Sequence, residues 1–312
     1  MKAMDRMKME ILMATHNGER YLQEQLDSVL KQTEDGWHLS VSDDGSTDGT
    51  LRILEEYAAR YPEKIGILHS GSRFGNARDH FLWLIRNCEA DWMMLCDQDD
   101  TWVPEKTAIF REAADRAETD FGAETPLLIF SDQTPTDGEL RPLADSLMRY
   151  QKQYTKEFDY RSILMQNVVT GGAMAVNRAL ADLALACTDF SGVIMHDWWM
   201  AAAAARFGKI VYIDKPLGTY RQHGGNSVGA KAVGSAAYTR DRMGKTDEVR
   251  SSIQRKKTQA GIFRNTYRNR LTGEDLAFLD GFVREKSGIG FYLRYGKLIH
   301  GIERKAGMAL LG

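Results

Sequence analysis

The feature that most constrains the fold is an apolar run that ends in carboxylates. Residues 92–96 (Trp-Met-Met-Leu-Cys) form a continuous apolar run of strand length, as expected for a strand buried on both faces of a sheet. Three carboxylates follow within four residues: Asp97, Asp99 and Asp100. Because ligands of open α/β sheets bind beyond the carboxyl ends of the strands, this segment predicts a ligand site at a strand end.

The spacing of Asp97 and Asp99 suits a metal ion. Crowded carboxylates repel one another, and two of them can offer oxygen ligands to one hard cation, Mg²⁺ or Mn²⁺, which in turn could grip a diphosphate. The alternative is a solvated acidic turn in which Asp100 or Thr101 only caps the following helix. For the pair we favour the metal.

Strand-like and helix-like segments alternate along the first 117 residues. We expect strands at residues 9–14, 38–42, 65–69 and 92–96, each followed by a helix, at 21–31, 50–61, 76–87 and 105–117. Such units predict right-handed crossovers and an α/β fold with a mostly parallel sheet covered by helices on both faces. Later in the chain we expect strands at 127–130, 173–176, 210–213 and 217–220, a helix at 198–207, and a substrate-side loop at 134–162.

Charge divides the chain into an acidic body and a basic tail. Residues 231–312 hold 17 Lys and Arg against 8 Asp and Glu, a net +9, whereas the first 230 residues carry −11. We therefore expect a catalytic domain at 1–229 and a helical extension at 230–312. The tail could meet an anionic phospholipid surface or a lipid-linked diphosphate, or be a basic solvated helical face.

An amphipathic segment near the carboxyl terminus bears on what the basic tail contacts. One helical face carries the apolar residues Phe291, Tyr295, Leu298 and Ile302, with Arg294, Lys297 and Arg304 elsewhere on the helix. This face could lie on a membrane, pack on the catalytic domain or form a dimer.

Other bulk features point to a cytoplasmic protein. The cysteines, Cys88, Cys96 and Cys187, lack metal-ligand spacing, and we interpret them as reduced packing residues. Residues 1–9 have no apolar core of a signal peptide, and no run of about 18 apolar residues predicts a membrane span.

The second strand is also followed by acidic residues. Asp43 and Asp44, with a glycine turn, suit recognition of a base or ribose. The spacing from Asp44 to Glu55 also fits a calcium-binding EF-hand loop. We reject calcium because residues 37–42 alternate like a strand, whereas an EF-hand needs an entering helix.

Three motifs in order carry a family resemblance: residues 14–19 (Ala-Thr-His-Asn-Gly-Glu), 43–50 (Asp-Asp-Gly-Ser-Thr-Asp-Gly-Thr) and 97–100 (Asp-Gln-Asp-Asp). Together they resemble the inverting glycosyltransferases of family 2, which have the GT-A fold. Residues 196–199 (His-Asp-Trp-Trp) and 220–227 are similar to those of bacterial rhamnosyltransferases of surface-polysaccharide assembly.

The resemblance implies a donor site at the strand ends. The implied nucleotide-sugar contacts are Thr15, Asn17, Glu19, Asp44, Arg78 and Asp97. Within this set Asp44 would meet the pyrimidine base, Arg78 would approach the base or diphosphate, and Asp97 would touch the ribose or sugar.

The resemblance also implies the catalytic groups. Asp99 would bind the metal and Asp197 would be the base, while Gly171 and Gly172 would form the floor on which donor sugar and acceptor meet. The indoles of Trp198 and Trp199, beside Asp197, could stack on a sugar ring and raise the pKa of Asp197 by excluding water. The alternative for Asp197 is a helix N-cap.

The histidines near these residues are open to several interpretations. His223, with Arg221 as a companion charge, is expected to contact the metal or diphosphate, and the alternative is a loop histidine bonded to backbone. His196 could orient Asp197 or simply pack.

These observations predict a metal-dependent inverting glycosyltransferase. It would transfer L-rhamnose from dTDP-rhamnose to a surface polysaccharide or lipid-linked acceptor, at the inner face of the cytoplasmic membrane, without nucleic acid as a partner. UDP-glucose or UDP-galactose are alternative donors. A sugar-nucleotide pyrophosphorylase is disfavoured because residues 14–19 contain no Lys, and a non-catalytic binding protein because Asp99 and Asp197 are both present.

Overall fold

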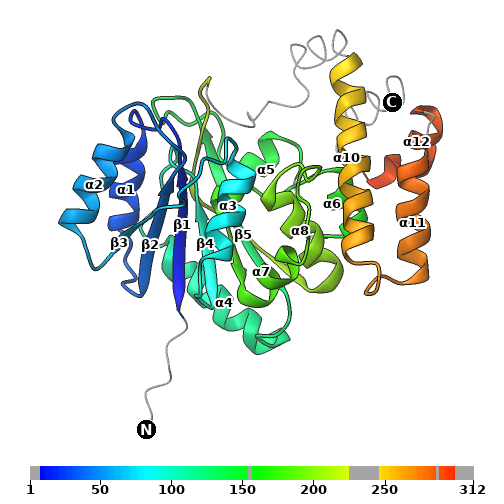
Figure 1. Cartoon of the computed structure of the whole chain (residues 1–312), viewed down its shortest axis with the longest axis horizontal. Helices are drawn as coiled ribbons and strands as arrows, with labels where there is room; N and C mark the ends of the chain where they lie inside the picture. The colour runs from blue at the N-terminus through cyan, green and yellow to red at the C-terminus, as the bar shows by residue number, and fades with distance from the viewer. Residues whose placement is uncertain (1–7, 154–156, 225–245, 286–287, 299–312) are drawn as a thin grey trace.

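The protein is built on one seven-stranded sheet. The computed structural model describes residues 8–153, 157–224, 246–285 and 288–298 (Figure 1). The strands lie in the order β3-β2-β1-β4-β6-β5-β7. Their bounds are β1 Met9–Thr15, β2 Trp37–Asp43, β3 Ile65–Leu68, β4 Trp92–Cys96, β5 Leu127–Thr136, β6 Met174–Asn177 and β7 Lys209–Arg221. Strand β6 runs antiparallel to β4 and β5, and the other described pairs are parallel.

Helices cover both faces of the sheet. They are α1 Leu22–Leu30, α2 Thr50–Arg60, α3 Ala77–Arg86, α4 Lys106–Phe121, α5 Leu147–Tyr150, α6 Tyr160–Met165, α7 Arg178–Leu185, α8 His196–Phe207, α10 Thr246–Thr266, α11 Gly273–Arg284 and α12 Gly288–Tyr295. One buried cluster joins the sheet to α1, α2 and α4, and a second joins it to α3, α6, α7 and α8. The predicted α/β fold with a mostly parallel sheet is confirmed.

The second half of the sheet differs in detail from the prediction. The strands expected at 210–213 and 217–220 are one strand, β7, which stays paired with β5 through register shifts at Ser131 to Thr134. Strand β5 extends to Thr136, so part of the expected loop at 134–162 is sheet. Helix α7 was not predicted. Its N-cap is Asn177, whose side chain accepts the Leu180 N–H.

The helices of the C-terminal extension pack on α6 and α8 (Figure 1). Phe263 and Tyr267 of α10 lie against Trp199 of α8, with ring centroids 5.5 and 5.6 Å away. Asp275 of α11 accepts hydrogen bonds from Arg206 of α8 and from the Tyr160 hydroxyl. The described extension therefore shares a core with the sheet, and the domain division at 229 and 230 stays a prediction.

The predicted amphipathic face lies partly on α12. Tyr295 is buried against Phe278 and Phe282 of α11, whereas Leu293 is 77% exposed. Ile302, Arg304 and the Phe291 side chain lie outside the described residues. Part of this face thus packs on its own chain, and membrane contact and dimerisation stay predictions.

Two further expectations can be compared with the structure. Cys88, Cys96 and Cys187 are buried and unpaired with one another, as predicted. Among the helices that the structure describes, none combines the length and the apolarity needed to cross a membrane.

Candidate active site

The carboxyl ends of β1, β2 and β4 border a cavity of about 370 Å³. Its walls come from segments that are far apart in the sequence, including Thr15, Asp44, Asp97, Gly171, Asp197 and Tyr220. Parallel strands bring their carboxyl ends to one edge of a sheet, which is why the motifs after β1, β2 and β4 meet here.

Gly171 and Gly172 form a narrow floor between two carboxylates. A Cβ on Gly172 would lie 2.6 Å from Asp97 Oδ2, and one on Gly171 would lie 3.8 Å from Asp197 Cβ. The backbone of Gly172 hydrogen-bonds to Asp97 and that of Gly171 to Asp197. Asp97 and Asp197 thus contact two consecutive glycines of this floor.

Both carboxylates resist ionisation. Desolvation raises the pKa of Asp97 to about 7, and the negative charges of Asp99 and Asp197 act in the same direction. Desolvation likewise raises the pKa of Asp197 to about 7, against hydrogen bonds from the Trp198 and Gly171 backbone. Such shifts are typical of groups that accept or donate protons at neutral pH.

A buried lysine lies beneath the floor. Lys106, in the first turn of α4, is 1% exposed, and its Nζ donates to the Gly172 carbonyl over 2.9 Å. The same Nζ lies 3.9 Å from the centre of the Trp102 ring. Burial lowers the pKa of Lys106 to about 8, and the charge of Asp100 opposes that shift. This residue was not predicted from the sequence, although a lysine on the apolar face of α4 indicates a buried lysine.

Asp99 and His223 come together from distant parts of the chain. His223 Nε2 donates to Asp99 Oδ2 over 2.7 Å, and both side chains are about one-fifth exposed, at 19% and 18%. A carboxylate and an imidazole this close together could both bind one divalent cation, and the carboxylate suits Mn²⁺ or Mg²⁺. Among the described residues no three His, Cys, Asp or Glu side chains are placed to hold one metal ion, so further ligands would have to come from donor phosphate oxygens and water.

The predicted donor residues divide into two groups. Thr15 and Asp44 border the cavity. The Asp44 carboxylate accepts the N–H groups of Phe74 and Gly75, over 2.5 and 2.7 Å, which draws that loop to the strand end. Asn17 and Glu19 instead join the two loops, since their side chains accept the Thr47 and Gly49 N–H groups over 2.8 and 2.5 Å.

Arg78 and the tryptophans point elsewhere than expected. The Arg78 guanidinium pairs with Asp79 and donates to the Val193 carbonyl over 2.6 Å. Trp199 is fully buried in the core, where its indole N–H donates to the Ala184 carbonyl, so it cannot be a sugar-stacking wall. The Trp198 indole donates to the Ile163 carbonyl. Neither Arg78 nor Trp198 is among the described residues that border the cavity, and their donor contacts stay predictions.

Several alternatives from the sequence are now decided. Residue Met195, not Asp197, occupies the N-cap of α8, so the cap explanation of Asp197 is wrong. Asp100 does not cap α4, whose N-cap is Glu105, but accepts the Arg221 N–H over 2.8 Å. The rejection of an EF-hand is confirmed, because strand β2 precedes Asp44.

The structure decides between the two interpretations of His196. It packs on Phe81, with ring centroids 4.4 Å apart, and within the described structure neither of its ring nitrogens has a hydrogen-bond partner. It therefore does not orient Asp197 by a hydrogen bond, and burial lowers the pKa of His196 to about 3. The Arg221 guanidinium binds Glu24 and the Gly138 carbonyl, and its role as a companion charge of His223 stays a prediction.

Two basic side chains at the cavity were not predicted. His16 and Arg73 both border it, and their Nε2 and Nη2 atoms lie 3.4 Å apart. Sequence reasoning had no signal for Arg73, because it lies in a loop whose position depends on Asp44.

Comparison with known proteins agrees with this geometry. A family model described as glycosyl transferase family 2 matches residues 10–182. The chain is 30% identical over 245 residues to a dTDP-rhamnosyl transferase, RfbG, of Shigella flexneri, an alignment that covers 73% of this chain and 77% of that protein. It is 24% identical over 230 residues to an uncharacterised glycosyltransferase, alr2836, of Nostoc, covering 71% of this chain and 66% of that protein.

A solved structure supports the fold. The crystal structure of S. aureus TarS residues 1–349 in complex with UDP-GlcNAc is similar, with a TM-score of 0.59 at 15% identity. The comparison covers 98% of this chain and 90% of that chain. The fold is that of the GT-A glycosyltransferases, and the chain belongs to glycosyl transferase family 2.

Proposed function

We propose that this glycosyltransferase is an inverting enzyme that transfers L-rhamnose from dTDP-β-L-rhamnose to a saccharide of a surface polysaccharide or its lipid-linked precursor. The observation that carries the reaction type is the pair of buried carboxylates, Asp97 and Asp197, which border one cavity and contact the consecutive glycines Gly172 and Gly171. Support for the donor comes from the similarity to a protein named as a dTDP-rhamnosyl transferase.

Asp197 is proposed as the general base. Inversion requires the acceptor hydroxyl to attack the anomeric carbon from the face opposite the leaving nucleoside diphosphate. As the new C–O bond forms and the bond to the diphosphate oxygen breaks, the hydroxyl proton passes to Asp197. Its raised pKa matches a base that accepts a proton near neutral pH.

The donor is proposed to lie over the ends of β1, β2 and β4. Thr15 and Asp44 would bind the nucleotide, with Asn17 and Glu19 shaping the loops around it, and Asp97 would contact the ribose or the sugar. Each of these positions is supported by the contacts described above.

Asp99 and His223 are proposed to hold the cation, with Mn²⁺ or Mg²⁺ as the candidates. When bound, the cation would neutralise the charge that develops on the leaving diphosphate. The support for this assignment is that the His223 imidazole lies 2.7 Å from the carboxylate of Asp99, which borders the cavity.

The location and partners follow from the same proposal. A lipid-linked acceptor would place the protein at the inner face of the cytoplasmic membrane, and the basic residues of 231–312 would favour an anionic surface. Contact with the membrane or with a second copy through 230–312 is part of this proposal.

Thermal-shift binding of dTDP, UDP, GDP and ADP, with and without Mn²⁺, tests the donor site. A ligand that binds only the folded protein raises the melting temperature. We expect an Mn²⁺-dependent rise with dTDP that is absent in Asp99→Ala, followed by rhamnosyl transfer from dTDP-rhamnose to a saccharide acceptor. A preference for UDP would instead indicate glucosyl or galactosyl transfer. No shift with any nucleoside diphosphate would overturn the proposal.

A further inference from the structure

The loop that leads into α8 is held from two sides. Residues 189–195 precede the first turn of α8, which carries Asp197. From the side of α3, Arg78 Nη1 donates to the Val193 carbonyl over 2.6 Å and to the Ser191 carbonyl over 3.5 Å. This contact explains why the Arg78 guanidinium is directed away from the cavity.

The opposite side of the loop rests on α10, in the C-terminal extension. The Gln259 side-chain oxygen accepts the Ile194 N–H over 2.8 Å, and Gln259 is 0% exposed. Because the partner is an N–H donor, the amide must present its oxygen here. Gly192 also meets α10 closely, since a Cβ there would lie 2.6 Å from Thr258 Cγ2 and 2.7 Å from Ile262 Cδ1.

The far end of α8 is held by the same extension. Arg206, in the last turn of α8, pairs with Asp275 of α11, which also closes a capping box with Thr272. Figure 1 shows α10 and α11 standing side by side next to α8. The helix that carries Asp197 is therefore fixed by α10 just before its first turn and by α11 at its last turn.

We propose that Gln259 is a positioning residue, which fixes the start of α8 and thereby sets where the Asp197 carboxylate lies above the Gly171–Gly172 floor. This inference rests on the proposed role of Asp197 as the base. A shift of about 1 Å in a reacting group can reduce the rate by about a hundredfold, so a single buried hydrogen bond two residues before the helix can control catalysis.

The C-terminal extension lies outside the region matched by the family model, residues 10–182. With Gln259 in this role, the extension would take part in positioning the base. The extension would not contact the donor. It would act through the backbone of Ile194, and loss of the Gln259 contact should therefore affect the chemical step rather than donor affinity.

Gln259→Met tests the inference in the full-length protein. Methionine keeps the length and apolar bulk of the side chain but removes the acceptor, whereas Gln259→Glu keeps an acceptor oxygen. Gln254→Met, on the exposed face of α10, is the matched control. We expect Gln259→Met to lower kcat about ten- to a hundredfold, with donor KM within about twofold of wild type. Gln259→Glu should recover most of kcat, and Gln254→Met should leave it unchanged.

Hydrogen exchange of the peptide that spans 189–197 provides a readout that does not depend on turnover. Faster exchange there in Gln259→Met, with an unchanged nucleotide-induced melting shift, is the expected result. Gly192→Ala, whose Cβ would meet Thr258 Cγ2 at 2.6 Å and displace the loop from α10, should lower kcat without weakening nucleotide binding, and it serves if Gln259→Met fails to fold.

Two outcomes would overturn the inference: unchanged kcat and exchange in Gln259→Met, or equal impairment of Gln259→Glu and Gln259→Met. Failure of the proposed function is distinguishable, because then the wild type would transfer no sugar or Asp197→Asn would remain active.

Discussion

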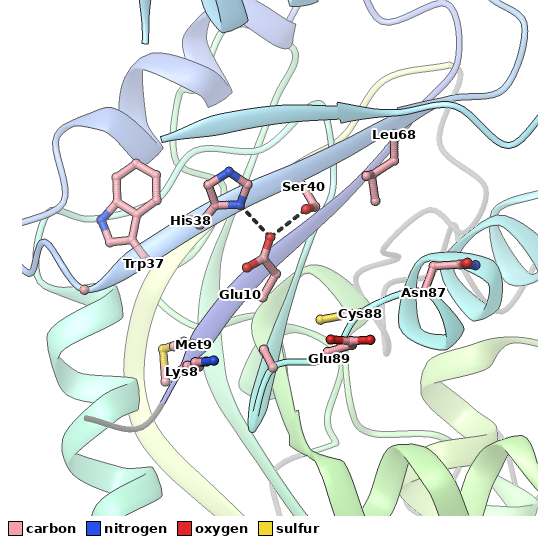
Figure 2. Close-up of a pocket in the computed structure, with 12 residues that line it drawn as sticks. Lys8, Met9, Glu10, Trp37, His38, Ser40, Leu68, Asn87, Cys88 and Glu89 are labelled. Carbon is pink, nitrogen blue, oxygen red and sulfur yellow. Dashed lines mark hydrogen bonds and ion pairs between the residues drawn. The ribbon is translucent and has the colours of Figure 1, made fainter. Parts of the chain in front are cut away.

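The amino and carboxyl ends of the central strands each border a cavity, or hollow. The carboxylates with raised pKa values border the smaller of the two. At the amino ends, a hollow of about 620 Å³ contains Glu10, which accepts hydrogen bonds from His38 Nδ1 over 2.7 Å and from the Ser40 hydroxyl over 2.6 Å (Figure 2). At the carboxyl ends, about 370 Å³ is bordered by Asp97 and Asp197, whose pKa values are raised to about 7.

The difference lies in how charge is compensated. The Glu10 carboxylate accepts a hydrogen bond from His38, and this bond raises the pKa of His38, which favours the charged form of the imidazole. Asp97 and Asp197 are buried, and desolvation makes both resist ionisation, with the charges of Asp99 and Asp197 adding to the effect on Asp97. Carboxylates buried at the strand ends, not the size of a cavity, therefore distinguish the candidate active site.

The largest expected effect is the loss of the base. Asp197→Asn keeps the shape of the side chain but cannot accept the hydroxyl proton, so we expect kcat to fall by about 10²–10⁴-fold. Nucleotide binding, measured by thermal shift, should be retained. If Asp197→Asn transferred sugar at the wild-type rate, Asp197 would not be the base, and its raised pKa would not distinguish the carboxyl-end hollow as the active site.

Loss of the metal ligands should come next. In Asp99→Ala and His223→Ala we expect the affinity for Mn²⁺ in the presence of dTDP to fall by at least about tenfold, because one of two protein ligands is gone. Calorimetric titration of Mn²⁺ measures this directly. His38→Ala is the matched histidine control at the other hollow, and an equal loss there would contradict the assignment.

The dependence of kcat on pH sharpens the comparison. The base is active only when deprotonated, and its pKa is raised from the ordinary value of an aspartate to about 7. We therefore expect kcat to rise about tenfold per pH unit below 7 and to level off above it. Steady-state rates between pH 5.5 and 8.5 test this. A rate that stays flat down to pH 5 would mean that the base titrates normally.

The smallest effect is expected at the amino-end hollow. Glu10→Gln should leave kcat unchanged and lower the free energy of unfolding by no more than about 1 kcal/mol, because the pair is partly exposed. The folded-state pKa of His38 is raised above 6.5, so the pair stabilises the fold fully below pH 6.5 and loses this contribution as pH rises through the folded value. Urea unfolding should therefore show a larger loss at pH 6 than at pH 8. A fall in kcat would show that this hollow participates in the reaction.

The sequence predicted the first half of the molecule well, for local reasons. Residues 92–96 are apolar and are followed at once by carboxylates, and β4 and the cavity are found where that pattern indicates. The second half was harder. A bulged pairing carries β7 past Pro216, and α7 is a short helix whose cap bond is made by Asn177, so periodicity alone gave an incomplete account of both.

The predicted site residues show the same limit. Thr15, Asp44, Asp97 and Asp197 border one cavity as the motifs implied. Arg78 was implied by the same resemblance, yet its guanidinium is directed at Val193 because the loop before α8 passes close to α3. A motif gives the residue type and its place in the chain, whereas the direction of a side chain depends on its neighbours.

The sequence by itself determined the alternation of strands and helices and the placement of carboxylates directly after β2 and β4, because both are properties of short stretches of chain. Only the tertiary structure decided that Asp97 and Asp197, a hundred positions apart, share one glycine floor. It also decided that Lys106 is buried beneath that floor and that Gln259 reaches the start of α8. The physical reason is that these contacts form where distant elements pack, and the local periodicity of a sequence does not specify which elements become neighbours.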